Sequence, residues 1–215
     1  MQPTPALFTR LIQSIAATIE EHAEEVTALD QAIGDGDHVY NLQRGIHALI
    51  AQSAEFSQLD WGATWQKIGM TLMSTVGGAS GSLYGTLFVT MSKAARERPL
   101  DLTTFAEVFA EGVEAVKKRG KADIGEKTML DVLIPVAQAL RQSAAESARL
   151  PDVLSHLNRV AEAGVESTRD MLPTKGRASF LGERARGHLD AGAKTSQLMI
   201  AAIAKVLAEQ SAAPT

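Results

Sequence analysis

Residues 8–38 read FTRLIQSIAATIEEHAEEVTALDQAIGDGDH, and this stretch joins a helical pattern to an acidic, glycine-rich turn. Its apolar residues recur at spacings of three and four, which is the period of an amphipathic α-helix. The pattern predicts one long helix that ends at Asp30 and carries the acidic turn at its C-terminus. The apolar positions are Phe8, Leu11, Ile12, Ile15, Ile19, Val26 and Leu29.

The turn concentrates three carboxylates, those of Asp30, Asp35 and Asp37, and is followed by His38 and Asn41. Two carboxylates about 4 Å apart near a protein surface repel by roughly 4 kcal/mol, so this crowding indicates a counter-ion. Carboxylate oxygens favour Mg²⁺, Mn²⁺ or Ca²⁺. An ordinary solvated turn is the alternative, since Asp and Gly both favour turns. Three carboxylates followed by two further polar groups favour the metal site.

Several well-known motifs are excluded at this turn. An EF-hand loop starting at Asp35 needs glutamate where Ile46 stands, and one starting at Asp30 needs an acidic residue where Ala32 stands. The Walker pattern is absent, and Val39 occupies the place of the third glycine of a dinucleotide fingerprint. A magnesium site that keeps some waters and relies on substrate phosphates fits three carboxylates better.

The rest of the chain is also predicted to be helical, with short polar or glycine-rich connections. No convincing pair of strands with period two is present. Eight helices of about 13 to 24 residues with short connections favour an all-α, antiparallel up-and-down bundle over an α/β sheet. After the first helix, the expected ranges are 40–52, 62–76, 82–96, 104–120, 131–140, a helix following Pro151, and 192–209.

Two helix ends carry specific signals. Thr104 and Glu107 form a capping-box pattern that predicts the start of the fifth helix, and Gly120 is expected to end it. Pro135 lacks a backbone donor, so it should kink the sixth helix or lie in its first turns.

The unusual connections follow helices one, three, five and seven. In an up-and-down bundle these odd-numbered connections share one end of the molecule. The sequence therefore predicts a single rim that contains the acidic turn, and a ligand is expected to bind there.

Length and composition limit the classes of function. A chain of 215 residues fits one domain, and the formal charge of −4 with no dense basic block argues against nucleic-acid binding. The chain has no cysteine, and Met1 to Arg10 lacks the pattern of a signal peptide, so we expect a cytoplasmic protein. The uncharged run 68–92 is too rich in glycine and hydroxyl residues to span a membrane.

Three further segments are candidates for the rim. The run 77–82, GGASGS, leaves backbone N–H groups unobstructed before a helix and can cradle phosphate, although such turns also serve helix packing. The segment 125–131 supplies charge, a hydroxyl and a methionine, or is simply a helix start with core residues. The long segment 176–193 carries arginines of the kind that pair with phosphate. Three histidines inside helices are expected to be surface or structural residues: His22, His47 and His156.

Taken together, four ordered segments resemble the nucleotide-binding subunits, DhaL, of dihydroxyacetone kinases and the matching domain of single-chain kinases. The resemblance spans nearly the whole chain, so residues 1–215 are expected to form one such domain. The segments are Asp30 with 34–38 and Asn41, then 77–81, then 127–131, then 176–179 with Asp190 and 192–193.

The resemblance implies an eight-helix barrel that binds ADP or ATP at one end through two Mg²⁺ ions. It implies a kinase that phosphorylates a hydroxyketone, such as dihydroxyacetone, held on a separate DhaK-like subunit. The metal ligands would be Asp30, Asp35 and Asp37; contacts to phosphates or sugar would be His38, Asn41, Ala79 and Ser80; residues enclosing the nucleotide would be Gly120, Met129, Arg177 and Asp190. No general acid or base is assigned in this chain, since positioning and electrostatics carry most of phosphoryl transfer.

Two positions depart from the family pattern, with Val39 in place of glycine and Ala191 in place of proline. We expect Val39 with Tyr40 to add bulk beside the metal and phosphates, and Ala191 to loosen the turn that precedes the last helix. The phosphoryl donor stays open between exchanging ATP and a retained ADP rephosphorylated by a DhaM-like phosphohistidine protein of the phosphotransferase system. A homodimer is also left open.

Two rival functions are a non-catalytic nucleotide sensor, motivated by Val39, and a fatty-acid kinase-type nucleotide domain with an acyl-carrying partner.

Overall fold

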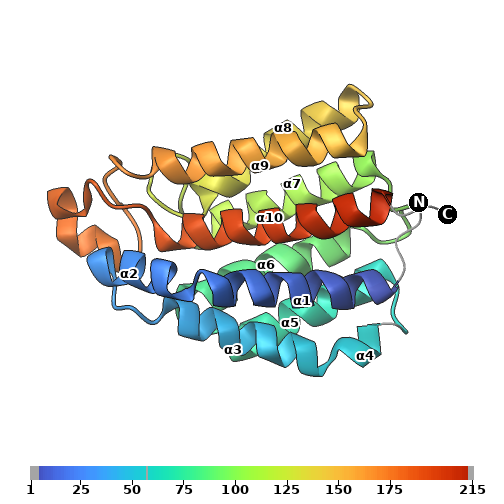
Figure 1. The fold of residues 1–215 in the computed structure, drawn as a ribbon, viewed down its shortest axis with the longest axis horizontal. Coiled ribbons are helices and arrows are strands. Elements are labelled where there is room, and N and C mark those ends of the chain that lie inside the picture. The colour runs from blue at the N-terminus through green and yellow to red at the C-terminus, as the bar shows by residue number, and fades with distance from the viewer. Residues whose placement is uncertain (1–4, 57, 213–215) are drawn as a thin grey trace.

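The computed structural model describes residues 5–56 and 58–212, and this part of the chain is helical with no β-strand (Figure 1). The predicted all-α class is confirmed. The elements are α1 (Pro5–Glu21), α2 (Ala23–Ile33), α3 (His38–Ala51), α4 (Ser53–Phe56), α5 (Trp61–Thr75), α6 (Gly78–Ala94), α7 (Leu102–Gly120), α8 (Leu130–Ala145), α9 (Leu150–Ser167), the 3₁₀ segment η1 (Arg177–Ala185) and α10 (Ala191–Ala212).

The helices form a closed ring. Each of α5 to α10 packs against the next along the chain, α3 packs against both α1 and α5, and α10 closes the ring by packing against α1. Figure 1 shows these helices running up and down along one long axis. The expected antiparallel arrangement is therefore present, with α2 and η1 added at one end and α4 at the other.

The first helix differs from its prediction. It is divided at His22, where the backbone leaves helical geometry, and α2 then continues to Ile33, three residues beyond Asp30. The hydrogen bond from the Val26 amide to the His22 carbonyl keeps the two segments in one line. The predicted end at Asp30 is wrong because apolar Ile33, which is 3% exposed, extends the buried face by one turn.

The predicted capping box at Thr104 is also wrong. Helix α7 begins earlier, and Asp101 is its N-cap, because the Asp101 carboxylate accepts a hydrogen bond from the Thr104 amide at 2.7 Å. A carboxylate at the N-cap satisfies an amide that has no partner within the helix. Pro135 lies inside α8, which runs through it to Ala145.

The ring is filled by apolar side chains, and its two ends differ. Aromatic rings gather near the starts of α1, α5 and α7, with the centroids of Phe8 and Trp61 4.6 Å apart and those of Trp65 and Phe105 6.1 Å apart. The opposite end carries the connections 34–37, 76–77, 121–129 and 168–190. One end is thus sealed by apolar contacts, and the other is available for polar chemistry.

Within the described residues, no helix combines the length and the apolar character needed to cross a bilayer. The predicted cytoplasmic location stays a prediction.

Candidate functional site

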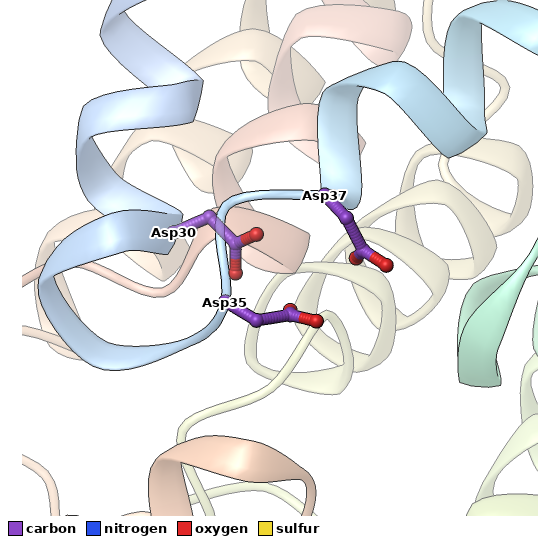
Figure 2. A group of neighbouring side chains, drawn as sticks. All are labelled: Asp30, Asp35 and Asp37. Carbon is purple, nitrogen blue, oxygen red and sulfur yellow. The ribbon is translucent and has the colours of Figure 1, made fainter.

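The acidic turn brings the three predicted carboxylates together. Asp30 lies in the last turn of α2, Asp35 follows on the turn, and Asp37 directly precedes α3. One oxygen of each carboxylate lies within 4.8 Å of an oxygen of the other two, and Figure 2 shows the three side chains facing a common space. This spacing suits divalent metal binding through carboxylate oxygens.

Two glycines make this turn geometrically feasible. A Cβ at Gly34 would fall on the Asp30 carboxyl group, and Gly36 has a φ of 76°, which disfavours other residues. The glycines therefore let the chain reverse tightly enough for Asp35 and Asp37 to return toward Asp30.

Each carboxylate keeps oxygen atoms for a ligand. Asp30 accepts a hydrogen bond from the His38 amide at 3.1 Å through Oδ2, and Asp35 pairs with the Arg177 guanidinium at 2.6 Å. Asp37 stands at the N-cap of α3 but makes no side-chain capping bond. Because Asp37 is not used to cap its own helix, its carboxylate is available to the common space.

His38 connects three helices at the edge of the turn. Its Nε2 lies 2.9 Å from Thr195 Oγ1 on α10, and its Nδ1 lies 3.3 Å from Ser80 Oγ on α6. Burial lowers the pKa of His38, although the nearby charges of Asp30 and Asp37 act in the opposite direction. Burial thus favours the neutral form of the imidazole, and the two hydrogen bonds fix its orientation.

The glycine turn before α6 lies beside α3. A Cβ at Gly77 would come within 2.5 Å of Asn41 Oδ1, so only glycine allows this approach. Gly78 has a φ of 66° and begins α6, with exposed Ala79 in its first turn. The first amides of a helix have no partner within the helix, and the start of α6 lies beside Asn41 at Gly77 and beside His38 at Ser80.

Arg44 was not predicted as a site residue, yet it borders the same glycine turn. Its Nε donates a hydrogen bond to the Thr75 carbonyl at the end of α5 at 2.6 Å, and its Nη2 would lie 3.2 Å from a Cβ at Gly77. The sequence signal was weak, because one arginine on an amphipathic helix is usually a solvated residue. Its position three residues after Asn41 places it on the same face of α3.

The other predicted residues lie on the α7–α8 and α9–α10 connections. Met129 is 6% exposed and lies next to Gly192, while Gly120 ends α7 beside Leu83. Arg177 begins η1 and is 65% exposed in its side chain despite its contact with Asp35. The contact between Asp35 and Arg177 thus joins the first and last connections of the predicted rim, at the end of the barrel that also carries the other two.

Asp190 carries an unusual carboxyl group. It directly precedes α10 and accepts a hydrogen bond from the Ala193 amide at 2.7 Å. Burial of the carboxyl raises its pKa to about 7; the nearby charges of Asp131 and Asp30 add to the rise, whereas the Ala193 amide and the charge of Lys127 oppose it. Asp190 thus adds a weakly acidic group near the triad.

The two residues that depart from the family pattern are both buried. The expected crowding by Val39 is wrong, because its side chain is 4% exposed and belongs to the apolar core inside the first turn of α3. Ala191 is likewise buried at the start of α10. The exposed residue beside the turn is Tyr40, which is 67% exposed.

The fold and the site define an all-helical barrel that carries three neighbouring carboxylates, a glycine turn at a helix N-terminus and arginines at one end. This combination is typical of proteins that bind a phosphorylated ligand together with a divalent metal. The sequence model of the DAK2 domain matches residues 32–205, and the chain belongs to this family.

Curated relatives match over most of their own length. The chain is 42% identical over 194 residues to the ADP-binding subunit DhaL of PEP-dependent dihydroxyacetone kinase 1 of Listeria innocua, covering 90% of this chain and 92% of the relative. It is 41% identical over 183 residues to the corresponding subunit of Escherichia coli, covering 85% and 87%.

A solved structure with the same fold is the native dihydroxyacetone kinase of C. freundii, at 25% identity and a TM-score of 0.73. The present chain is covered to 98% but spans only 35% of that kinase chain. A second structure of that kinase, in complex with AMP-PNP and Mg²⁺, shares the fold at 24% identity and a TM-score of 0.72, again with 98% and 35% covered.

Proposed function

We propose that this chain is the ADP- or ATP-binding subunit of a dihydroxyacetone-type kinase, and that residues 1–215 form one nucleotide-binding domain. Its closely matching relatives are named as ADP-binding subunits of such kinases. The observation that carries the proposal is the triad of Asp30, Asp35 and Asp37, with ligand atoms within 4.8 Å of one another beside a glycine turn.

The donor set fits magnesium. Three carboxylates supply hard oxygen ligands, and Mg²⁺ is usually held by a few carboxylates together with substrate phosphates and water. We propose that Asp30, Asp35 and Asp37 hold two Mg²⁺ ions. When bound, the ions neutralise the phosphates and align the reacting oxygens, and this chain needs no general acid or base.

The remaining site residues orient the nucleotide. The first amides of α6, near Ala79 and Ser80, point positive dipoles at a phosphate group. Neutral His38 and the amide of Asn41 offer hydrogen bonds without adding charge, and Arg177 offers a planar guanidinium to an anion. Met129 and Gly120 enclose the base or sugar, with Asp190 at the start of α10.

The acceptor lies outside this chain. We propose a separate DhaK-like subunit that carries the hydroxyketone, which agrees with the chain spanning about one third of the C. freundii kinase. The donor is either exchanging ATP or retained ADP rephosphorylated by a DhaM-like protein. A slow release of ADP together with phosphorylation by a phosphohistidine protein would identify the second scheme.

The rival sensor function loses its motivation. It was based on Val39 crowding the site, but Val39 is buried in the core. No feature of the described residues favours the fatty-acid kinase-type alternative over the dihydroxyacetone kinase.

The test is magnesium-dependent nucleotide binding followed by phosphoryl transfer. Calorimetry should detect ADP binding that requires Mg²⁺, and the chain mixed with ATP, Mg²⁺ and a hydroxyketone-loaded DhaK-type subunit should form the sugar phosphate. Asp35→Asn should weaken nucleotide affinity by at least the roughly 10- to 100-fold seen when an outer-shell metal partner is lost. Asp60→Asn is the matched control, because Asp60 is an exposed N-cap at the opposite end of the barrel.

Nucleotide binding that is independent of Mg²⁺, or equal losses for Asp35→Asn and Asp60→Asn, would refute the metal site. Binding without transfer to any hydroxyketone-loaded subunit would instead support the sensor.

A further inference from the structure

The connection between α9 and α10, residues 168–190, carries two of the proposed nucleotide-binding residues. Arg177 lies in its middle and Asp190 at its end. The chain leaves the barrel at Thr168 and returns at His188, with the Gly187 amide donating a hydrogen bond to the Arg169 carbonyl at 2.9 Å. We call the residues Thr168, Arg169, Gly187 and His188 the stem of this connection.

Lys127 binds both sides of the stem. Its Nζ donates hydrogen bonds to the carbonyls of Thr168 at 2.5 Å, Arg169 at 3.2 Å and His188 at 2.6 Å. An ammonium group has three N–H donors, so these contacts use all of them. The contacts join the α7–α8 connection to both parts of the stem, the residues that leave the barrel and the residues that return to it.

Lys127 is held rigidly for this role. The residue is 1% exposed and has a φ of 59°, and its neighbours are fixed by buried Asp131, which accepts hydrogen bonds from the amides of Gly125 at 2.5 Å and Thr128 at 2.8 Å. Lysine is rarely fully buried unless its charge is compensated. The hydrogen bonds of Lys127 go to carbonyls, and the nearby negative charges of Asp190 and Asp131 compensate part of the cost of burying its ammonium group.

Glu126 provides a second tie farther along the same connection. Its carboxylate accepts a hydrogen bond from Thr174 Oγ1 at 2.5 Å and pairs with Lys175 at 3.5 Å. Arg177, which contacts Asp35, follows only two residues after Lys175. Glu126 thus holds the connection just before Arg177, and Lys127 holds it at the stem.

We infer that Lys127 and Glu126 are positioning residues that hold the α9–α10 connection over the site, so that Arg177 and Asp190 reach the nucleotide. Both residues act through the connection that they hold, and the positive charge of Lys127 also acts on Asp190 at the end of that connection. The effect on nucleotide affinity rests on the proposed function, whereas the effect on the connection itself does not.

The first experiment measures the connection without nucleotide. Hydrogen exchange of the backbone amides in residues 170–187 should become faster in Lys127→Met, which keeps an unbranched side chain but cannot donate a hydrogen bond. Val153→Ala is the control, since Val153 is 1% exposed at the start of α9 and its truncation lowers stability at the opposite end of the barrel. Exchange in 170–187 that is equally fast in both variants would overturn the inference.

The second experiment measures function in the same variants. Lys127→Met should weaken Mg²⁺-dependent ADP binding by roughly 2- to 30-fold, as expected for a residue that acts without touching the ligand, and should raise the KM for ATP more than it lowers kcat. Val153→Ala should leave both unchanged. If the wild-type chain binds no ADP, the proposed function fails, while the exchange data still decide the inference.

A surface variant covers the case in which Lys127→Met does not fold. Glu126→Ala changes a partly exposed residue, so the barrel should form. It should speed exchange near residues 173–177 and weaken ADP binding in the same direction. Unchanged exchange and unchanged affinity in Glu126→Ala would contradict the inference.

Discussion

At the scale of single residues, the ionisation of Asp190 should be visible in the stability of the protein. Burial raises the pKa of its carboxyl to about 7. Below about pH 4 the group is protonated in both the folded and the unfolded chain and contributes nothing. As pH rises toward 7, the unfolded chain releases a proton that the folded protein retains, so unfolding becomes more favourable by an amount on the order of a few kcal/mol.

The variant Asp190→Asn has no carboxyl group to ionise at this position. We therefore expect its free energy of unfolding to fall less between pH 5 and pH 8 than that of the wild type. Asparagine still accepts the hydrogen bond from the Ala193 amide, so the cap of α10 is kept. Urea denaturation at pH 5 and pH 8 without added metal measures the effect. Free energies of unfolding that change in parallel for the two proteins would contradict the raised pKa.

At the scale of elements, the close contact of α8 and α9 depends on a proline and a glycine. Pro135 has no N–H, so the Asp131 carbonyl one turn earlier lacks its usual helical donor. Gly164 of α9 packs against this carbonyl, and a Cβ there would lie 2.5 Å from Asp131 O and 3.0 Å from Val132 Cα. These are backbone atoms, so they cannot move without shifting α8.

Gly164→Ala should therefore lower the free energy of unfolding by about 1–3 kcal/mol, as expected for overpacking. Gly62→Ala is the control within another helix, because its Cβ would have no neighbour closer than 3.5 Å. That variant should be as stable as the wild type or more stable by up to about 1 kcal/mol. Chemical denaturation distinguishes them, and equal stability of the two variants would show that α9 can move away from α8.

At the scale of the whole molecule, closure of the ring gathers four connections at one end. A ligand that contacts several of them should stabilise the folded state as a unit. With Mg²⁺ and ADP at 100 times the dissociation constant, we expect the free energy of unfolding to rise by about 2.7 kcal/mol. Thermal denaturation with ADP, with and without EDTA, measures this, and stabilisation by ADP that survives EDTA would argue against metal-dependent binding.

Much of this architecture was predictable because it follows from local periodicity. The apolar spacing predicted the helices of the ring, and their short connections predicted that the odd-numbered ones share an end. Errors occurred at helix ends. Helix α2 continues past Asp30 because the core buries Ile33. Helix α7 has Asp101 and not Thr104 as its N-cap because the Asp101 carboxylate accepts a hydrogen bond from the Thr104 amide.

The sequence by itself determined the chemistry of the acidic turn. Residues 30–37 contain three aspartates and two glycines. Their spacing brings the three negative charges together on one tight turn, independently of the rest of the fold. The glycine turn at 77–78 is similarly evident from its composition.

Only the tertiary structure decided which distant residues support that turn. Lys127 is buried against carbonyls that lie 41 to 61 positions further along the chain, and His38 is oriented by Thr195, which is 157 positions away. Val39 entered the core instead of crowding the site. Burial and hydrogen-bond partners of this kind arise from the packing of whole helices, which the local sequence does not encode.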